Sequence, residues 1–272
     1  MSNRDREYVL GTHDAELARL GLQHRLWSEQ TFACWRRCGI APGTVVLDIG
    51  AGPGYTAFDL VPLVAPGGRV IAVDESDRFI AHVRSRAEAL GVTAIDARVA
   101  DVQEMEIEPA SVDVAYARWL LCFVPRPDAV VARAARALKP GAVLAVQDYV
   151  DWQALSLSPP SEAFRRVMPA VGKSWREHGG DPEIGKRLPA MMRAAGLRVE
   201  TVRPLQRIAR PRDPLWQWPT TFFANFIPLL VERGLVSPGD WLAFQQDWQS
   251  HTADPDAFFW TPPMVEIIAR RA

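Results

Sequence analysis

The sequence has few cysteines and almost no net charge. Its 272 residues include three cysteines, Cys34, Cys38 and Cys122, and the formal net charge is −1 at pH 7. Cys34 and Cys38 lie one helical turn apart, but Ala41 stands where a radical iron–sulfur motif would have its third cysteine. We therefore interpret the cysteines as free core thiols of a protein in a reducing compartment. The balanced charge gives no electrostatic reason to expect a nucleic acid as partner.

Long apolar segments and metal-ligand motifs are absent as well. The charged stretch from Met1 to Glu7 lacks the apolar core of a signal peptide. The longest apolar run of the C-terminal half, from Phe222 to Val231, contains Asn225 and Pro228 and is too short to cross a bilayer. No His-Glu-x-x-His and no paired Cys-x-x-Cys spacing occurs, so we expect no metal site. These observations favour a cytoplasmic protein without a membrane span.

The stretch from Val45 to Gly54 is the most informative part of the sequence. It contains an apolar, β-branched strand that runs directly into glycines at positions 50, 52 and 54. A strand that breaks into glycines before a helix is expected to present backbone N–H groups and bare Cα atoms to a ligand. Tyr55 stands where the dinucleotide motif G-x-G-x-x-G would have its third glycine, and no Walker lysine follows. Asp48 at the end of the strand favours a cationic ligand over a phosphate.

Strands and helices alternate from residue 45 to about 150, which is typical of a parallel sheet with helices on both faces. Strands are predicted over 45–49, 69–74, 94–99, 112–117, 143–149, about 197–209 and 264–269. Helices are predicted over 14–38, 56–64, 77–90, 128–138 and 184–195. In 211–259, prolines 219, 228, 238 and 255 are expected to break helical patches. The helix over 77–90 is expected to bury Phe79, Ile80, Val83, Ala87 and Leu90.

This pattern predicts an α/β fold with a Rossmann-like, doubly wound, seven-stranded and mostly parallel sheet. We expect an N-terminal helical lid in 1–43, a ligand-binding sheet core in 44–150, and completion of the sheet in 151–272. The last part would carry helical insertions around the sixth strand, at about 151–184 and 211–259.

The motif Asp48-x-Gly50-x-Gly52-x-Gly54 resembles motif I of the class I S-adenosylmethionine-dependent methyltransferases. The resemblance covers about 44–150. Asp74 resembles the motif II acid, which holds both ribose hydroxyls, and Asp101 with Val102 resembles the pair at the adenine. The resemblance therefore implies S-adenosyl-L-methionine as cofactor, held by Asp48, Gly50, Ala51, Gly52, Gly54, Asp74, Glu75, Asp101, Val102 and Arg118.

The segment after the fourth predicted strand indicates which type of methyltransferase within this family the chain resembles. Enzymes of this family that methylate exocyclic amines of nucleobases carry an Asn/Asp-Pro-Pro-aromatic motif there, whereas this chain has Ala117-Arg118-Trp119-Leu120. The chain is more similar to the small-molecule type, including the branch related to quinone-biosynthesis C-methyltransferases. Its segment Tyr8-Val9-Leu10-Gly11 resembles the N-terminal lid of that branch. The resemblance implies methyl transfer to O, N or C of a small, largely apolar acceptor, and leaves open whether the chain forms a homodimer.

Candidate residues for acceptor binding and catalysis follow from this architecture. His24 interrupts an apolar stripe on the predicted lid helix and is a candidate general base; the alternative is a hydrogen-bonded core histidine. Insertions after the fifth or sixth strand lie over the methyl end of the cofactor in this family. Candidate acceptor-binding residues are therefore Tyr8, His13, Trp119, Trp152, Phe222 and Phe223. The alternative for the aromatic residues is that they form the core of the insertions.

Two other functions are considered. The chain could bind the cofactor without transferring methyl, as a regulator or as a catalyst of a cofactor-assisted rearrangement, because no clear catalytic base is present. A nicotinamide oxidoreductase is disfavoured by Tyr55 and by the absence of a Tyr-x-x-x-Lys pair.

Overall fold

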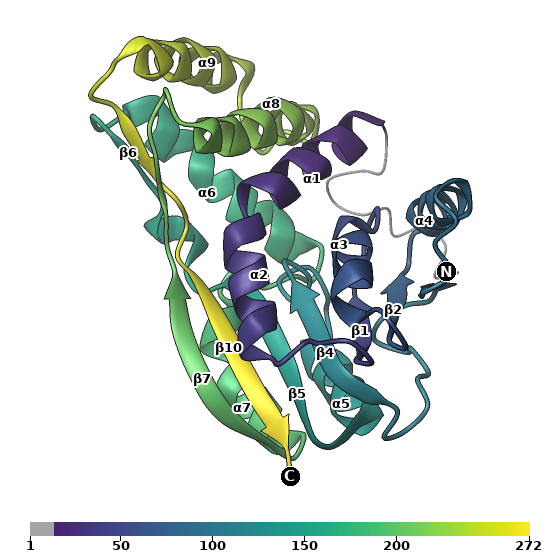
Figure 1. Cartoon of the computed structure of the whole chain (residues 1–272). Coiled ribbons are helices and arrows are strands. Elements are labelled where there is room, and N and C mark those ends of the chain that lie inside the picture. The colour runs from purple at the N-terminus through teal and green to yellow at the C-terminus, as the bar shows by residue number, and fades with distance from the viewer. Residues whose placement is uncertain (1–13) are drawn as a thin grey trace.

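The computed structural model describes residues 14–272, and a seven-stranded sheet forms its centre (Figure 1). The strands of this sheet are β1 (Val45–Ile49), β2 (Arg69–Asp74), β3 (Ile95–Val99), β4 (Val112–Arg118), β5 (Leu138–Tyr149), β7 (Leu197–Leu205) and β10 (Met264–Arg271). Their order is β3-β2-β1-β4-β5-β10-β7. Strands β1 to β5 pair in parallel, whereas β10 is antiparallel to both of its neighbours. The predicted α/β fold with a seven-stranded, mostly parallel sheet is confirmed.

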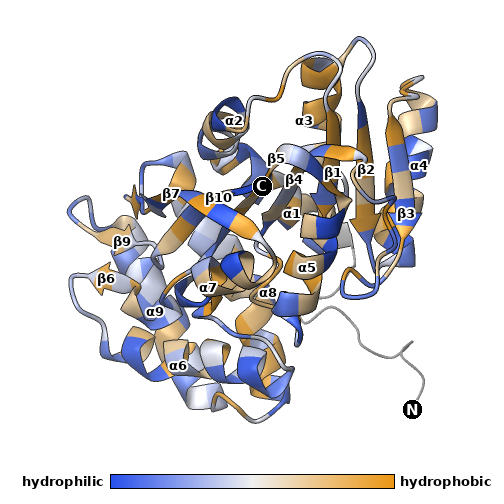
Figure 2. Ribbon diagram, turned by 90° about the horizontal axis from the view of Figure 1, so that it is seen from below, coloured by the Kyte–Doolittle hydropathy of each residue, from blue (hydrophilic) through white to orange (hydrophobic). Residues whose placement is uncertain are grey.

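Helices cover both faces of this sheet, which is why its central strands consist mostly of buried apolar residues. The helices that flank the sheet are α2 (Ser28–Arg37), α3 (Tyr55–Val64), α4 (Asp77–Ala89), α5 (Pro127–Ala137) and α7 (Leu188–Ala194). Helices α2 and α3 share a buried apolar cluster with one face, and α5 and α7 share a cluster with the other. Seen along the molecule from below, β1 and β2 are among its most hydrophobic segments (Figure 2).

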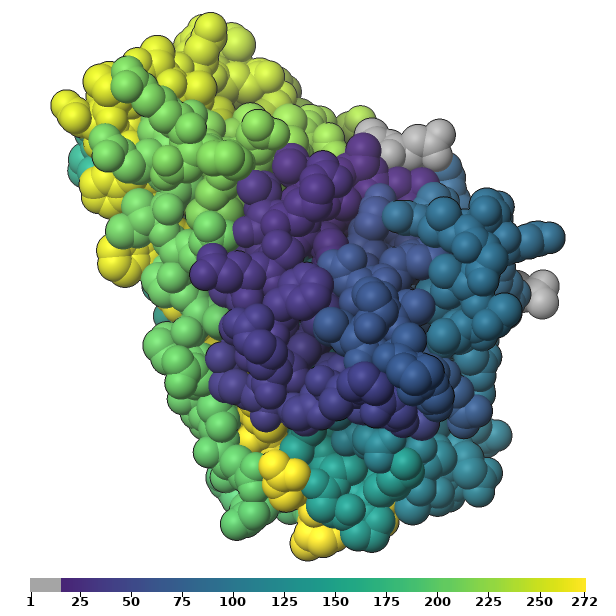
Figure 3. Space-filling view, viewed as in Figure 1, coloured from purple at the N-terminus to yellow at the C-terminus, as the bar shows by residue number. Residues whose placement is uncertain are grey.

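The N-terminal helical segment is not one helix, as predicted, but two. Helix α1 (Asp14–Leu26) ends before Trp27, and α2 then begins in a new direction. The two have different partners, since α1 contacts α8 (Gln217–Glu232) and α3 whereas α2 packs against the sheet (Figure 1). Figure 3 shows both helices, in purple, at the surface between the green segments of the C-terminal half and the blue segments that follow in the sequence.

The residues beyond β5 build a cap at the carboxyl end of the sheet (Figure 1). Its helices are α6 (Glu162–Glu177), α8 and α9 (Pro238–Ala253). A three-stranded sheet completes it with β6 (Ser156–Ser158), β9 (Phe258–Trp260) and β8 (Ile208–Ala209). Short 3-10 turns lie at Trp152–Ala154, Ile184–Lys186 and Pro214–Trp216. Helix α6 lies within the helical insertion predicted at about 151–184, whereas the small sheet is not predicted from the sequence.

Three local predictions are wrong. The predicted sixth strand over 197–209 splits, because the chain leaves β7 after Leu205 and pairs Ile208 with Trp260 of the small sheet. Pro219 and Pro228 do not break α8: Pro219 lies in the first turn, where an N–H has no helical partner, and apolar burial holds the helix together around Pro228. Leu90, expected to be buried, is 60% exposed because α4 ends one residue earlier.

Candidate functional site

The glycine loop between β1 and α3 has a conformation that other residues rarely adopt. Gly50, Gly52 and Gly54 have φ angles of 69°, 52° and 80°. A Cβ atom at Gly50 would lie 2.7 Å from Leu120, whereas a Cβ atom at Gly52 would have no neighbour within 4 Å. The backbone at Gly52 is therefore open to the approach of a ligand.

The backbone N–H groups of this loop are used within the protein, contrary to the expectation that they face a ligand. Those of Gly50 and Ala51 donate to Val73 O at 2.8 and 3.0 Å, and that of Gly54 donates to Ala51 O at 3.0 Å. The N–H of Gly52 donates to Asp74 Oδ2 at 2.8 Å. The loop thus offers a ligand bare Cα surface and neighbouring carboxylates.

Asp74 joins the end of β2 to the glycine loop. Besides the bond from Gly52, its Oδ1 accepts a hydrogen bond from Ser76 N at 2.9 Å. Burial raises the pKa of Asp74, and these two backbone bonds oppose the rise. Each carboxylate oxygen has a second lone pair, so Asp74 keeps acceptor sites for the hydroxyls of a ligand.

Asp48 is a buried carboxyl group with an unsatisfied oxygen. Its side chain is 3% exposed, and Oδ2 has no hydrogen-bond partner in the described part of the chain. Burial raises the pKa of Asp48 to about 7, while the nearby Arg118 charge opposes the rise. A cationic group of a ligand would supply the missing partner and stabilise the ionised carboxylate.

The remaining residues predicted to contact the cofactor lie along the same edge. Asp101 follows β3, is half-buried, and accepts hydrogen bonds from Gln103 N at 2.8 Å and Gln103 Nε2 at 3.0 Å. Val102 is buried, and Glu75 is exposed just after β2. Because β2 and β3 pair with Asp74 opposite Val99, these residues are neighbours at the carboxyl edge.

His24 and Arg118 form a buried network between the N-terminal helices and the end of β4. The Arg118 guanidinium donates to His24 Nδ1 at 3.0 Å and to the Thr31 hydroxyl. His24 Nε2 lies 2.8 Å from Asp59 Oδ2. Because arginine only donates, Nδ1 must be the acceptor, and Nε2 carries the proton that it shares with Asp59.

The contacts of His24 in this network bear on which of its two expected roles it has. Burial, the largest effect, lowers the pKa of His24, so the ring is neutral at neutral pH. Its only lone pair faces Arg118, and His24 does not line the cavity described below. The arrangement matches the alternative of a hydrogen-bonded core histidine, and it fits a residue that positions Arg118 better than one that removes a proton.

Trp119 is held in an uncommon backbone conformation at the end of β4. Its φ angle is 50°, which bulky residues rarely adopt. Its N–H donates to Gln147 O at 3.0 Å, its indole Nε1 lies 2.8 Å from Met264 Sδ, and the Arg118 guanidinium lies 4.7 Å from its ring centre. These contacts turn the indole toward the cap.

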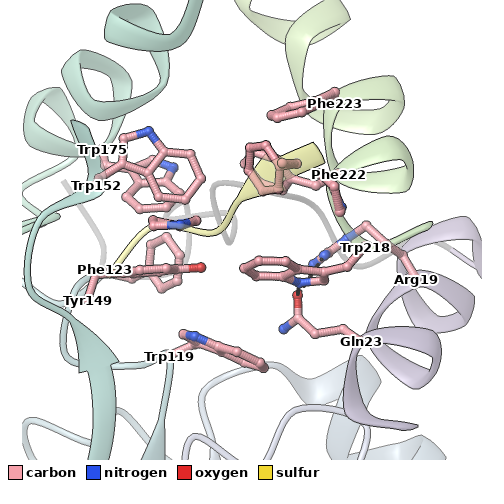
Figure 4. A pocket seen from close by; sticks show the side chains of 13 residues that line it. Arg19, Gln23, Trp119, Phe123, Tyr149, Trp152, Trp175, Trp218, Phe222 and Phe223 are labelled. Atoms are coloured by element: carbon pink, nitrogen blue, oxygen red, sulfur yellow. Dashed lines mark hydrogen bonds between the residues drawn. The ribbon is translucent and has the colours of Figure 1, made fainter. Parts of the chain in front are cut away.

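An aromatic cavity lies between the carboxyl end of the sheet, α1 and the cap (Figure 4). Its volume is about 30 Å³. It is lined by Arg19, Gln23, Trp119, Phe123, Tyr149, Trp152, Trp175, Trp218, Pro219, Phe222, Phe223, Phe259 and Pro262. Four of the predicted acceptor-binding residues, Trp119, Trp152, Phe222 and Phe223, therefore meet in one place. The other two, Tyr8 and His13, lie outside the described residues.

The sequence analysis missed several residues of this cavity. Trp175 and Trp218 belong to the tryptophan-rich segment after residue 150, and the high number of tryptophans there is the sequence feature that could have indicated them. Arg19 and Gln23 lie on α1 beside the predicted stripe, and no sequence pattern marks them. Among residues 14–272, no three His, Cys, Asp or Glu side chains are grouped to hold a metal ion. None of the helices described is long and apolar enough to span a membrane.

Known proteins resemble both the sequence and the fold. A family model described as "Methyltransferase domain" matches residues 40–196. A 37.1 kDa protein in transposon TN4556 of Streptomyces fradiae is 33% identical over 170 residues, 62% of this chain and 48% of that protein. The demethylmenaquinone methyltransferase of Lactococcus lactis is 28% identical over 152 residues, 56% of this chain and 59% of that protein. The chain thus spans about half the length of these two relatives.

A solved structure extends the likeness to most of the chain. The 4+2 cyclase SpnF is 18% identical and covers 89% of this chain and 80% of its own, with a TM-score of 0.59. At this identity the likeness shows a common fold alone. The family model, by contrast, matches more than half of the 272 residues and includes the glycine loop, Asp74 and Asp101. The chain therefore belongs to the methyltransferase-domain family, as a class I, S-adenosylmethionine-dependent member.

Proposed function

We propose that this protein transfers the methyl group of S-adenosylmethionine to O, N or C of a small, largely apolar acceptor. One observation carries the proposal: the glycine-loop site and the aromatic cavity meet at consecutive residues. Arg118 lies close enough to Asp48 for its charge to act on that carboxyl, and Trp119 lines the cavity. A cofactor held at the loop would therefore adjoin an acceptor held between the aromatic rings.

The residues of the loop site fit this cofactor. The unsatisfied Oδ2 of Asp48 suits the ammonium group of its methionine end, and the open face of Gly52 allows close approach to the backbone. Asp74 would accept the ribose hydroxyls, and Asp101 with Val102 would hold the adenine. When bound, the cofactor supplies an electrophilic methyl group on a sulfonium.

The side chains around the cavity bring the acceptor into place rather than react with it. Within the described chain, the ionisable residues that line the cavity are Arg19 and Tyr149, and neither is a strong base at neutral pH. Placing two reacting groups in line can lower a barrier by about 7–11 kcal/mol without a base. Helix α1 and the cap would exclude water from this contact.

The lack of a base among the described residues of the cavity also supports a second function. The protein could bind the cofactor and catalyse a rearrangement of the acceptor without methyl transfer. The two functions differ in product, because only methyl transfer converts the cofactor to S-adenosylhomocysteine.

Methyl-labelled S-adenosylmethionine, incubated with the protein and a panel of small aromatic acceptors, separates these functions. We expect label in an acceptor and an equal amount of S-adenosylhomocysteine, both lost in Asp74→Ala. An altered acceptor without label would support the rearrangement, and binding of the cofactor with no altered acceptor would support a regulator.

Other features of the whole protein belong to the same proposal. The three cysteines are free thiols, which supports a location in the cytoplasm. We also retain the division into a lid (1–43), a cofactor-binding core (44–150) and a region with substrate-cap insertions (151–272), and a homodimer remains open.

A further inference from the structure

The side-chain amide of Gln23 is fixed at the wall of the aromatic cavity by two donors. Its Oε1 accepts hydrogen bonds from Trp218 Nε1 at 2.9 Å and from an Arg19 guanidinium nitrogen at 3.0 Å. Arginine and tryptophan side chains only donate, so the oxygen must be the atom that faces them. The amide nitrogen Nε2 therefore points away from both donors, toward Trp119 (Figure 4).

This nitrogen is a donor without a partner in the part of the chain that the structure describes. Both hydrogen bonds of the Gln23 side chain use Oε1, and Nε2 has no partner among residues 14–272. The cavity that it faces is otherwise lined mostly by aromatic rings. Gln23 is partly exposed, so Nε2 is free to donate to an acceptor atom of a ligand held between these rings.

The positive charge of Arg19 at the cavity is neutralised by an ion pair with Glu16. Arg19 is the charged lining residue in the described part of the chain, and its guanidinium forms two hydrogen bonds with Glu16, at 2.6 and 2.7 Å. Both side chains are buried, with exposures of 5% and 0%. An anionic ligand would compete with Glu16 for Arg19, and a cationic ligand would be repelled by the guanidinium, which lies 5.9 Å from the Phe222 ring centre.

The walls of the cavity favour a flat ligand. The rings of Trp119 and Trp218 lie within 25° of parallel, with centres 6.1 Å apart. Trp152, Trp175 and Phe222 close the space with edge-on and tilted contacts. A volume of about 30 Å³ holds only a few atoms, so a ring-sized ligand must separate these side chains and stack between them.

We propose that the cavity binds an uncharged, flat aromatic or conjugated molecule, and that Gln23 Nε2 donates a hydrogen bond to a carbonyl or hydroxyl oxygen on it. The inference rests on the proposed function only in taking this cavity as the acceptor site. Gln23 would then set which acceptors bind and how they are oriented toward the cofactor site.

Equilibrium dialysis of the full chain with four naphthalene derivatives tests this selectivity. The probes are 2-acetylnaphthalene, 2-ethylnaphthalene, 2-naphthoate and 2-naphthylmethylammonium, which share a ring system and differ in oxygen and charge. We expect the ketone to bind about tenfold more tightly than the hydrocarbon, as one hydrogen bond in a dry site allows. Both ions should bind more weakly than the ketone.

Two variants identify Gln23 as the cause. Gln23→Glu keeps an oxygen for Trp218 and Arg19 and replaces the donor by a carboxylate oxygen. The preference for the ketone should disappear, and the ammonium probe should become the tightest of the four. Gln23→Leu should lose the preference for the ketone without binding the ammonium probe more tightly. Gln245→Glu, at an exposed position of α9, is the matched control and should bind like the wild type.

Three results would overturn the inference: no binding of any probe, tightest binding of 2-naphthoate by the wild type, or an unchanged ketone preference in both Gln23 variants. The proposed function fails separately, if S-adenosylhomocysteine does not bind or no methyl is transferred. Probe binding does not require the cofactor, so the two failures are distinguishable.

Discussion

Asp48 is the residue whose physical state depends most on the cofactor. Its buried carboxyl has a pKa of about 7 and an oxygen without a partner in residues 14–272. An ammonium group bound beside it would favour the ionised form, so the pKa would fall on binding. Below pH 7 the protein must then release a proton to bind the ligand.

Affinity for S-adenosylhomocysteine, which carries the same ammonium group, should therefore depend on pH. With a free-state pKa of about 7, binding should be about tenfold weaker at pH 6 than at pH 8, because most of the carboxyl is protonated at the lower pH. Calorimetry at both pH values measures this ratio. Asp48→Asn should bind weakly and with little pH dependence, and an unaltered ratio in that variant would show that Asp48 does not face the ligand.

His24 should act by positioning Arg118. If so, His24→Gln lowers the rate of methyl transfer by about tenfold or less and leaves the shape of the pH–rate profile unchanged between pH 6 and 8, because the lone pair of Nδ1 accepts from Arg118 and does not take a proton from the acceptor. Rate measurements between pH 6 and 8 test whether His24 positions Arg118 or acts as the base. His82→Gln, on α4 and half-buried, is the control. A loss of 100-fold or more with a vanished acidic limb would instead identify His24 as the base.

The site residues that can be predicted from the sequence are those that belong to one contiguous motif. The glycine loop, Asp48 and Asp74 were predicted because a buried strand, its end and the following turn are contiguous. Gln23 and the partners of Arg118 were not, because each acts through residues far apart in the chain: Trp218 lies 195 residues from Gln23, and His24 lies 94 from Arg118. For the same reason, the contacts of His24 could not be predicted from the sequence.

At the scale of elements, α1 is held beside the glycine loop by its contacts with α3. The backbone of Gly21 lies against Tyr55, whose hydroxyl donates to Leu17 O at 2.9 Å and whose ring stacks with His24 at 5.9 Å. A Cβ atom on Gly21 would lie 2.9 Å from the Tyr55 hydroxyl. Helix α1 can therefore cover the loop only because this position carries no side chain.

Gly21→Ala should destabilise the protein although alanine is the better helix former. Displacing Tyr55 should cost about 1–3 kcal/mol, which exceeds the gain of about 1 kcal/mol in helix propensity. Gly239→Ala in α9 is the matched control, since its nearest atom is 3.9 Å away, and it should be neutral or stabilising. Chemical denaturation compares the two; equal stabilisation by both would contradict the proposed packing.

Element boundaries were predictable where one pattern dominates and not where tertiary contacts decide. The strand from Arg69 to Asp74 has the predicted bounds, because six mostly apolar residues are flanked by glycines and a helix cap. The break at Trp27 was not predicted, since the apolar stripe continues through it. The division arises because α1 contacts α8, whose own helix forms around Pro228 by burying Phe222, Phe223 and Phe226.

At the scale of the whole molecule, the fold brings two kinds of surface to one edge. The parallel strands place the acidic residues and the glycine loop at their carboxyl ends, and α6 and α8 place aromatic rings beside them (Figure 1). Neither surface would be complete without the other, since Trp119 directly follows β4 of the sheet and lines the cavity. The central claim is that this edge binds S-adenosylmethionine next to an aromatic acceptor site.

Calorimetric titration with S-adenosylhomocysteine, with NADH as the competing dinucleotide, tests this claim most directly. We predict micromolar binding of S-adenosylhomocysteine to the wild type, at least tenfold weaker binding to Asp74→Ala, and no binding of NADH, because Tyr55 replaces the glycine that a dinucleotide loop needs. NADH binding without S-adenosylhomocysteine binding, or equal affinity of the wild type and Asp74→Ala, would contradict the account.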